Sequence, residues 1–216
     1  MRARQRRRLI AVAGFLATSV LASAESQNTL PNYSLLDVMV WGADLRMDAT
    51  TYAPDVKAQI QQLRQRSEAY RSKRIKPTGS SELGMAYNAQ VRYERRLVGG
   101  STSPGADALA LAYVTELRLC YEWEGSSDCP EREATFAAKY LTSHPAGPFS
   151  QYLPLLEAHR WLCAAEAYES EKVPAEATRT RNAYEQALST ARRSSSLLVR
   201  TAAGELGARA RCFVER

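Results

Sequence analysis

Residues 158–169 read AHRWLCAAEAYE and bring a histidine, an arginine, a tryptophan, a cysteine and two glutamates into twelve positions. Such a stretch is either a reactive cluster or the inside of a helix. Trp161, the small pair Ala164 and Ala165, and Tyr168 lie three, four and seven positions apart, the spacing of one face of an α-helix. We therefore predict a buried helical face rather than a reactive site.

The polar residues of this stretch are expected to have structural roles in the same helix. Cys163 is predicted to form half of a disulfide. His159 and Arg160 are expected where the helix turns toward a neighbour or solvent, with Glu166 as the nearest counter-charge and Glu157 as the alternative partner for Arg160.

The rest of the chain favours the same kind of structure. Ala, Leu, Glu, Arg and Gln dominate, and no run of alternating β-branched residues indicates a strand. We predict an all-α fold of about seven helices, arranged as an array of antiparallel helical hairpins with two disulfides. The predicted helices cover residues 33–47, 54–74, 128–143, 149–170, 174–193 and 195–213, with further helical segments between residues 81 and 123. Asp128 is expected to cap one of them, and Pro54 to open another.

The N-terminus has the layout of a cleaved export signal. Residues 1–8 hold five arginines and no acid, residues 9–22 are apolar, and small residues precede Glu25. The apolar run of 14 residues is shorter than the ~20 that span a bilayer as a helix, so cleavage after Ala24 is favoured over an uncleaved anchor. Residues 1–24 are the predicted signal, and residues 25–216 form one helical domain, with 99–105 as the candidate subdivision. We expect a periplasmic or secreted protein; the choice between the general and the twin-arginine route stays open.

Cleavage changes the charge of the chain. The full sequence has 29 basic and 23 acidic residues, and removal of the five signal arginines leaves 24 against 23. A nearly neutral mature chain gives no electrostatic basis for nucleic-acid binding. No later segment is long and apolar enough to span a membrane, so no span is expected after signal cleavage.

The four cysteines are expected to form disulfides, because an exported chain meets an oxidising compartment. Cys120 and Cys129 lie at the two sides of a predicted helical hairpin. Cys163 and Cys212 lie on helices two elements apart, which run parallel in an up-down-up stack. We prefer the pairs Cys120–Cys129 and Cys163–Cys212, with a cross-hairpin pairing such as Cys120–Cys163 as the alternative.

Residues 130–213 resemble a tetratricopeptide-type repeat. Residues 161–168 are similar to its first helix, residues 183–188 to the core of its second helix, and residues 136–141 followed by His144-Pro145 to the end of a preceding unit. The chain departs from the family in three respects: Ala164-Ala165 replaces the usual Leu-Gly, Thr180 is the small residue before Tyr184, and the unit exceeds the usual ~34 residues. The resemblance implies a degenerate array that binds protein or peptide and has no catalytic residues to carry over.

Catalytic and metal-binding patterns are sparse. The two histidines, His144 and His159, have no second ligand at metal spacing, and no G-x-S-x-G turn accompanies them. Disulfide formation would remove the thiols that a Cys–His nucleophile needs. We predict no cofactor and no metal. The alternative is a small cell-wall-directed glycan hydrolase, for which Glu116, Glu122, Glu157 and Glu166 are the candidate carboxylates.

One local cluster of positive charge remains after signal cleavage. It lies near the end of the second predicted helix, with Glu68 as the only acid, and comprises Arg64, Arg66, Arg71, Lys73, Arg74 and Lys76. Such a cluster is typical of a solvated helix C-terminus. The functional alternative is that the cluster docks an anionic partner. The acidic stretch 116–133 of the same chain is a candidate internal counterpart of the basic cluster. The sequence thus predicts an exported, non-catalytic binding or accessory protein whose partner and oligomeric state it does not specify.

Overall fold

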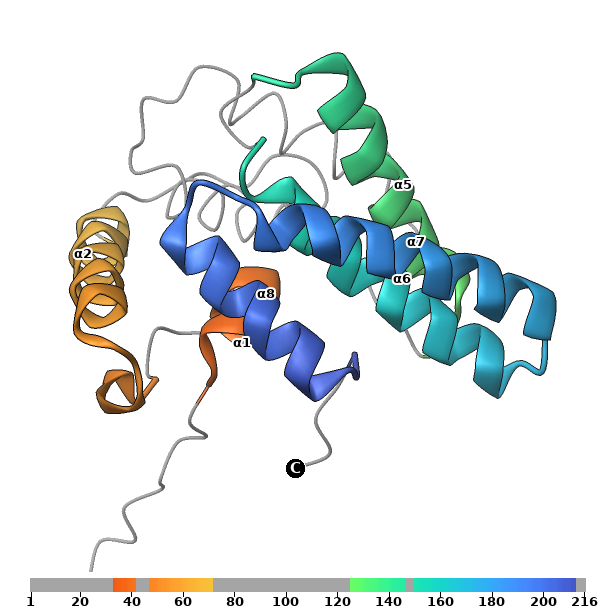
Figure 1. Cartoon of the computed structure of the whole chain (residues 1–216), viewed down its shortest axis with the longest axis horizontal. Helices are drawn as coiled ribbons and strands as arrows, with labels where there is room; N and C mark the ends of the chain where they lie inside the picture. Colours follow the sequence, from red (N-terminus) through yellow and green to blue (C-terminus); the bar gives the residue numbers. More distant parts are fainter. Residues whose placement is uncertain (1–32, 42–46, 72–124, 147–149, 213–216) are drawn as a thin grey trace, which may run out of the picture. The chain divides into compact units, whose positions relative to one another are not determined.

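The computed structural model describes residues 33–41, 47–71, 125–146 and 150–212 (Figure 1). Within these residues all regular structure is helical, which confirms the all-α prediction. The elements are α1 (Leu35–Trp41), the short 3-10 helix η1 (Ala49–Thr51), α2 (Pro54–Arg71), α5 (Asp128–Ser143), α6 (Leu153–Ser170), α7 (Pro174–Arg192) and α8 (Leu197–Arg209). The expected signal, residues 1–24, and the helical segments expected between 81 and 123 lie outside the described residues.

Helices α6 and α7 form an antiparallel hairpin and lie side by side along their length (Figure 1). The hairpin turns through a Schellman motif, in which Val173 N donates to Tyr168 O at 2.9 Å and Lys172 N donates to Glu169 O at 3.2 Å. Lys172 adopts the left-handed conformation at φ 61°. Pro174 then opens α7, where a missing N–H costs nothing. The turn is therefore made by backbone geometry and not by a glycine.

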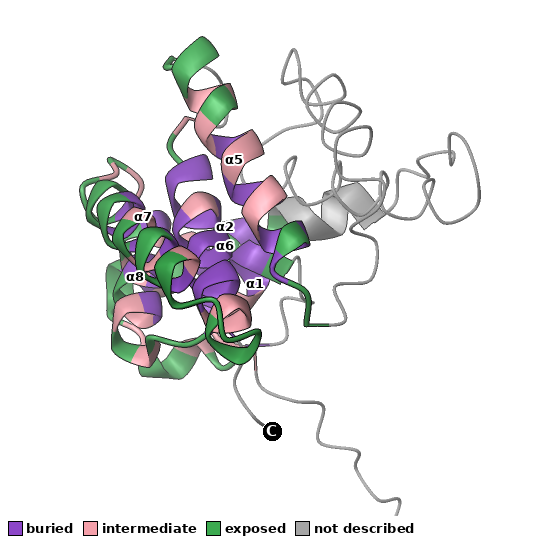
Figure 2. Cartoon of the chain, turned by 90° about the vertical axis from the view of Figure 1, so that its right-hand side faces the viewer, coloured by how far each residue is buried: buried purple, intermediate pink, exposed green. Residues whose placement is uncertain are grey.

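The two hairpin helices bury different amounts of surface. In α6 almost every residue from Leu153 to Ala165 is buried, since neighbours surround that half of the helix. In α7 only one stripe is buried, and it consists of Ala177, Thr180, Tyr184, Ala187, Leu188 and Ala191. Figure 2 shows the buried residues gathered on α6 and α1, with a broad exposed face on α7. Helix α6 is thus the centre of the core.

The start of α5 differs from the prediction. Asp128 is the first helical residue and not the cap, and the cap position belongs to Ser127. Ser127 donates its N–H and its hydroxyl to the Glu171 carboxylate at 2.9 and 2.7 Å. Asp128 instead forms an exposed ion pair with Arg132. The carboxylate that accepts from this helix start belongs to Glu171 at the end of α6. Local spacing therefore indicated the wrong capping residue, Asp128.

The end of α8 also differs. The helix was expected to reach residue 213, but it ends at Arg209, and Ala210 adopts a left-handed conformation with φ 48°. Cys212 therefore lies in the turn after the helix. The predicted buried face is correct at Val199, Ala202, Ala203 and Leu206.

The N-terminal elements complete the described core. Pro54 opens α2 as predicted, and α2 packs on α8. The first predicted helix, residues 33–47, is present as α1 from Leu35 to Trp41, and residues 42–46 lie outside the described part. Helix α1 packs against α6 and α8. Of the helices in the described ranges, none is long and apolar enough to cross a membrane.

Candidate functional site

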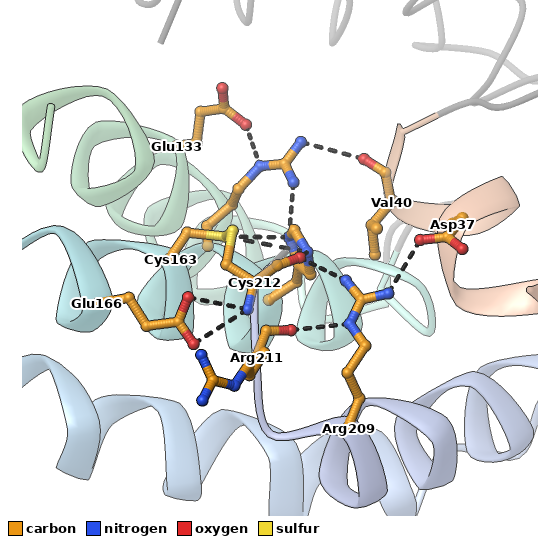
Figure 3. Close-up of a disulfide and its surroundings, with 10 residues drawn as sticks. Asp37, Val40, Glu133, Cys163, Glu166, Arg209, Arg211 and Cys212 are labelled. Carbon is orange, nitrogen blue, oxygen red and sulfur yellow. Dashed lines mark hydrogen bonds and ion pairs between the residues drawn. A yellow bond between two sulfur atoms is a disulfide. The ribbon is translucent and has the colours of Figure 1, made fainter. Parts of the chain in front are cut away.

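A disulfide joins Cys163, in the middle of α6, to Cys212, in the turn after α8 (Figure 3). The two Cα atoms are 4.8 Å apart, and both residues are buried. This is one of the two pairs preferred from the order of the helices. The described residues hold this one disulfide and not two: Cys129 is buried in the first turn of α5, and Cys120 lies outside the described part.

His159 lies beside the disulfide and is fully buried, so of its two expected surroundings, a neighbouring element or solvent, it has the first. Its Nε2 is 3.2 Å from Cys212 O, and its Nδ1 is 2.7 Å from Nη1 of Arg160. A carbonyl only accepts and a guanidinium only donates, so these two contacts place a single proton on Nε2. Burial, together with the charges of Arg160 and Arg209, holds the pKa of His159 well below its usual range. The imidazole is thus a neutral bridge.

Arg160 connects three helices from the interior of the fold. Its Nε donates to the Glu133 carboxylate on α5, and its Nη2 donates to Val40 O on α1 at 3.0 Å. The guanidinium also lies 4.4 Å from the ring centroid of Trp41. Glu133 is therefore the counter-charge of Arg160, and the expected partners Glu157 and Glu166 are wrong. Two acceptors of the guanidinium, Glu133 and Val40 O, lie on α5 and α1, and the third, His159 Nδ1, lies on α6 itself.

Glu166 and Glu157 have separate structural partners. Both oxygens of Glu166 accept the N–H of Cys212, at 3.2 and 3.1 Å, and burial raises the pKa of this carboxyl against the opposing effect of that hydrogen bond. Glu157 accepts from the Trp161 indole at 3.3 Å, and burial raises its pKa as well.

The positions of these two carboxyls bear on the hydrolase alternative. They are nine residues apart on α6, which separates them by about 13 Å along the axis and by half a turn around it. Paired glycosidase carboxyls lie ~5–10 Å apart on either side of one bond. Glu157 and Glu166 do not meet that requirement, and the other candidates, Glu116 and Glu122, lie outside the described residues.

Arg209 holds the turn that carries Cys212. Its Nε donates to Arg211 O at 2.8 Å, its Nη2 donates to Cys212 O, and its Nη1 pairs with Asp37 on α1 at 3.0 Å (Figure 3). One side chain at the end of α8 thus joins the disulfide turn to the N-terminal helix.

The same cluster contains the residue types of a metal site. Ligand atoms of His159, Cys163 and Cys212 lie within 4.8 Å of one another. The two sulfur atoms are bonded to each other, and both ring nitrogens of His159 are engaged by protein groups. In this oxidised form the cluster acts as a hydrogen-bonded support for the helices.

The predicted basic patch is only partly described. Arg64 donates to Met47 O and lines a shallow groove together with Lys57 and Gln61. Asp48 caps the start of η1, and its hydrogen bonds from Thr50 lower its pKa. The nearby positive charges of Lys57 and Arg64 lower the pKa further. The side chains of Arg66 and Arg71 and the whole of residues 72–76, which include Lys73, Arg74 and Lys76, lie outside the described part.

A surface depression at the end of the α6–α7 hairpin was not predicted. We call it the hairpin-end groove; its lining residues are Glu169, Lys172, Val173, Pro174, Ala177, Thr178, Arg181 and Asn182. Val173 is 39% exposed, and Arg181 forms an ion pair with Glu169 at 2.6 Å. The sequence signal for it is a lysine-valine-proline turn without glycine, which leaves an apolar side chain at the tip.

Two contacts at the start of α1 were also missed. Ser34 and Asp37 form a reciprocal cap, in which Asp37 N donates to the Ser34 hydroxyl at 3.2 Å and Ser34 N donates to the Asp37 carboxylate at 3.1 Å. The Ser-x-x-Asp spacing is a recognisable signal for this capping box. The second contact, from Glu205 on α8, comes from 169 residues away and has no local signal.

Comparison of the chain with protein-family models, with characterised proteins and with solved structures finds no match.

Proposed function

We propose that the chain is an exported, non-catalytic binding or accessory protein that presents a helical surface to a protein or peptide partner in the periplasm or outside the cell. Residues 1–24 serve as a signal that is removed after Ala24.

The buried Cys163–Cys212 disulfide is the observation that carries this proposal. Disulfides persist in oxidising compartments and are rare in the cytosol, which supports export. The groups around it that could perform chemistry are engaged in joining α1, α5, α6 and α8: His159 to Cys212 O, Arg160 to Glu133, and Glu166 to Cys212 N. An interior occupied in this way supports a binding function, with the exposed helical faces left for contact.

The α6–α7 hairpin supports a repeat-like arrangement. Small residues of both helices, among them Ala164, Ala165, Ala177 and Thr180, lie buried in the fold and permit close approach, as in a tetratricopeptide-type unit. We propose that residues 130–213 form such a unit in degenerate form. Its hairpin-end groove combines exposed Val173 with the charged Lys172 and Arg181, a composition suited to a mixed polar and apolar contact.

The first experiment tests export. The full chain with a C-terminal tag is produced in a Gram-negative host, and the mass of the tagged product is measured in periplasmic and cytoplasmic fractions. We expect a periplasmic product that lacks residues 1–24. A full-length product confined to the cytoplasm would contradict export.

The second experiment tests binding. The purified mature protein is used as bait in an envelope extract from its source, beside a double variant, Val173→Asp with Arg181→Glu, and a control, Lys139→Glu, on the exposed side of α5. We expect a stoichiometric partner with the wild type and the control, and at least a tenfold lower recovery with the groove variant, since a hot-spot change of about 1.4 kcal/mol corresponds to tenfold in affinity. Absence of any stoichiometric partner would count against a binding function.

A further inference from the structure

Three side chains of metal-binding type meet at the disulfide. Ligand atoms of His159, Cys163 and Cys212 lie within 4.8 Å of one another, and all three residues are buried. Among the residues that the structure describes, no other group of three His, Cys, Asp or Glu side chains is close enough to share one ion. An imidazole together with two thiolates is a ligand set of zinc, and thiolates favour zinc over hard ions such as Mg²⁺. The chemistry open to this cluster therefore depends on whether its two sulfurs are bonded to each other.

The distance between His159 and Cys163 already fits a shared ion. Cys163 Sγ lies 3.6 Å from His159 Nδ1. In a tetrahedral zinc site the Zn–N and Zn–S bonds are about 2.0 and 2.3 Å long, which places the nitrogen and the sulfur about 3.6 Å apart. The two residues are four positions apart on α6, so one face of a single helix sets this distance.

The orientation of the imidazole fits as well. His159 Nε2 donates to Cys212 O at 3.2 Å, so the lone pair is on Nδ1, the ring nitrogen nearer to Cys163 Sγ. A histidine that binds a metal commonly donates its other N–H to a backbone carbonyl, which fixes the ring. Nη1 of Arg160 lies 2.7 Å from Nδ1 and has to release it when an ion binds. The other guanidinium nitrogens of Arg160 keep their contacts with α5 and α1.

Cys212 can supply the second sulfur without a change in the helices. It lies in the turn after α8, directly after two exposed residues, which gives an ion a short path from solvent. The Cα atoms of Cys163 and Cys212 are 4.8 Å apart, so side-chain rotation can separate the unbonded sulfurs to the about 3.8 Å of a tetrahedral site. Glu166 accepts from Cys212 N, and Arg209 donates to Cys212 O (Figure 3). The turn therefore has supports that do not depend on the disulfide.

We propose that reduction of the Cys163–Cys212 disulfide converts this cluster into a zinc site, with Cys163 Sγ, Cys212 Sγ and His159 Nδ1 as protein ligands and a water molecule in the fourth position. The reductant is a dithiol, which passes two electrons and two protons to the disulfide and becomes a disulfide itself. Zn²⁺ then replaces the two thiol protons, which are released to solvent. Two thiolates and Zn²⁺ add no net charge to the interior, and neither does the disulfide that they replace.

The first test compares metal binding in the two redox states. The mature chain is reduced with dithiothreitol, freed of it by anaerobic gel filtration, and titrated with Co²⁺, whose absorption reports thiolate ligands and tetrahedral geometry. Zn²⁺ then competes for the same site. We expect the oxidised chain to bind at least ~100-fold more weakly, since losing two ligands exceeds the 10–100-fold effect of a residue that only orients a ligand. Equal affinity of the oxidised and reduced chains would overturn the proposal.

Matched variants of the reduced chain assign the ligands. Cys163→Ala should lower the affinity for Co²⁺ about 100-fold or more, and His159→Gln should lower it at least about tenfold. Cys129→Ala removes another buried cysteine and should bind as the wild type does. Binding that survives Cys163→Ala, or that is lost only in Cys129→Ala, would place the ion elsewhere and overturn the proposal.

X-ray absorption at the zinc edge, on the unmodified mature chain after reduction, keeps the proposal testable if the variants do not fold. We expect two sulfur atoms at about 2.3 Å and one imidazole nitrogen at about 2.0 Å from the ion. A shell of oxygen and nitrogen alone, or one of four sulfurs, would overturn the proposal.

Circular dichroism of the same samples follows the helices. If reduction lowers the helical signal, Zn²⁺ should restore it, because the free energy of metal binding then adds to that of folding. A reduced chain that neither binds Zn²⁺ nor regains helix with it would overturn the zinc site. The zinc site goes beyond the proposed binding function and does not depend on it. Export and capture through the hairpin-end groove are measured on the oxidised chain, so their outcomes are independent of this one.

Discussion

Arg160 of α6 and Glu133 of α5 form an ion pair whose side chains are only 5% and 6% exposed. The same guanidinium also donates to Val40 O and contacts His159. Loss of one partner of such a pair leaves an uncompensated charge in the interior, where solvation is poor. The pair is therefore the contact through which a single substitution disturbs α1, α5 and α6 together.

Glu133→Gln tests this pair. We expect it to lower the free energy of unfolding by about 3–5 kcal/mol, the usual cost of breaking a buried pair from one side. Urea titration followed by circular dichroism measures the loss. The matched control is Asp128→Asn in the exposed Asp128–Arg132 pair, for which about 0.5 kcal/mol or less is expected. A similar loss of unfolding free energy in both variants would show that the buried Arg160–Glu133 pair stabilises the fold no more than the exposed Asp128–Arg132 pair does.

The second prediction concerns the disulfide. Cys163 and Cys212 are 49 residues apart in sequence, and closing a loop of that length stabilises the fold by about 4 kcal/mol in the chain-entropy model. The double variant Cys163→Ala with Cys212→Ala should lose roughly this amount in urea titrations under oxidising conditions. Mass mapping of the unreduced protein should yield a peptide pair linked through these cysteines. A linked pair of Cys120 and Cys163 would instead support the cross-hairpin alternative.

The third prediction concerns pH. The folded pKa of His159 lies well below the ordinary value of 6.5, so the unfolded chain binds the extra proton first as the pH falls. The contribution of His159 to stability is thus complete above about pH 6.5 and decreases below it, by up to roughly 1.4 kcal/mol per pH unit. Unfolding free energies measured from pH 7.5 to 5 should show a smaller slope for His159→Gln than for the wild type.

A second histidine variant serves as the control for this slope. His144 is exposed at the C-terminus of α5, so His144→Gln replaces a histidine at the surface and not in the core. The raised pKa values of Glu157 and Glu166 act in the opposite direction, since their carboxyls lose stability as the pH rises through the acid range. The difference between variants, and not the wild-type curve alone, isolates His159. Identical slopes for all three proteins would contradict the assignment of a neutral buried imidazole.

The fourth prediction concerns the hairpin turn. Lys172 is exposed and adopts a left-handed conformation that costs a residue with a Cβ about 1 kcal/mol. Lys172→Gly should therefore raise the thermal midpoint, by the equivalent of about 0.5–1 kcal/mol. The opposite sign is expected for Lys139→Gly within α5, since glycine in a helix interior costs about 1 kcal/mol. Destabilisation by both changes would indicate that the lysine side chain itself supports the turn.

Local residue order accounts for most of the helices and several of their ends. Pro54 and Pro174 open helices because proline tolerates a first turn, and α5 ends at Ser143, directly before His144-Pro145. Of the predicted face in α6, Trp161, Ala164 and Ala165 are buried, whereas Tyr168 is only half-buried. The pair Cys163–Cys212 was favoured by the order of the helices alone. Each of these features depends on residues close in the chain or on helix connectivity.

The interior contacts depend on groups that are distant in the chain. Arg160 finds Glu133 27 residues away and Val40 120 residues away, and nothing near Arg160 in sequence distinguishes these partners from Glu157 or Glu166. The end of α8 and the support of α1 by Glu205 are of the same kind. Helix propensity and apolar spacing are short-range properties that residue order encodes directly. The choice of partner for a buried charge is made by desolvation, which exists only after the helices have come together.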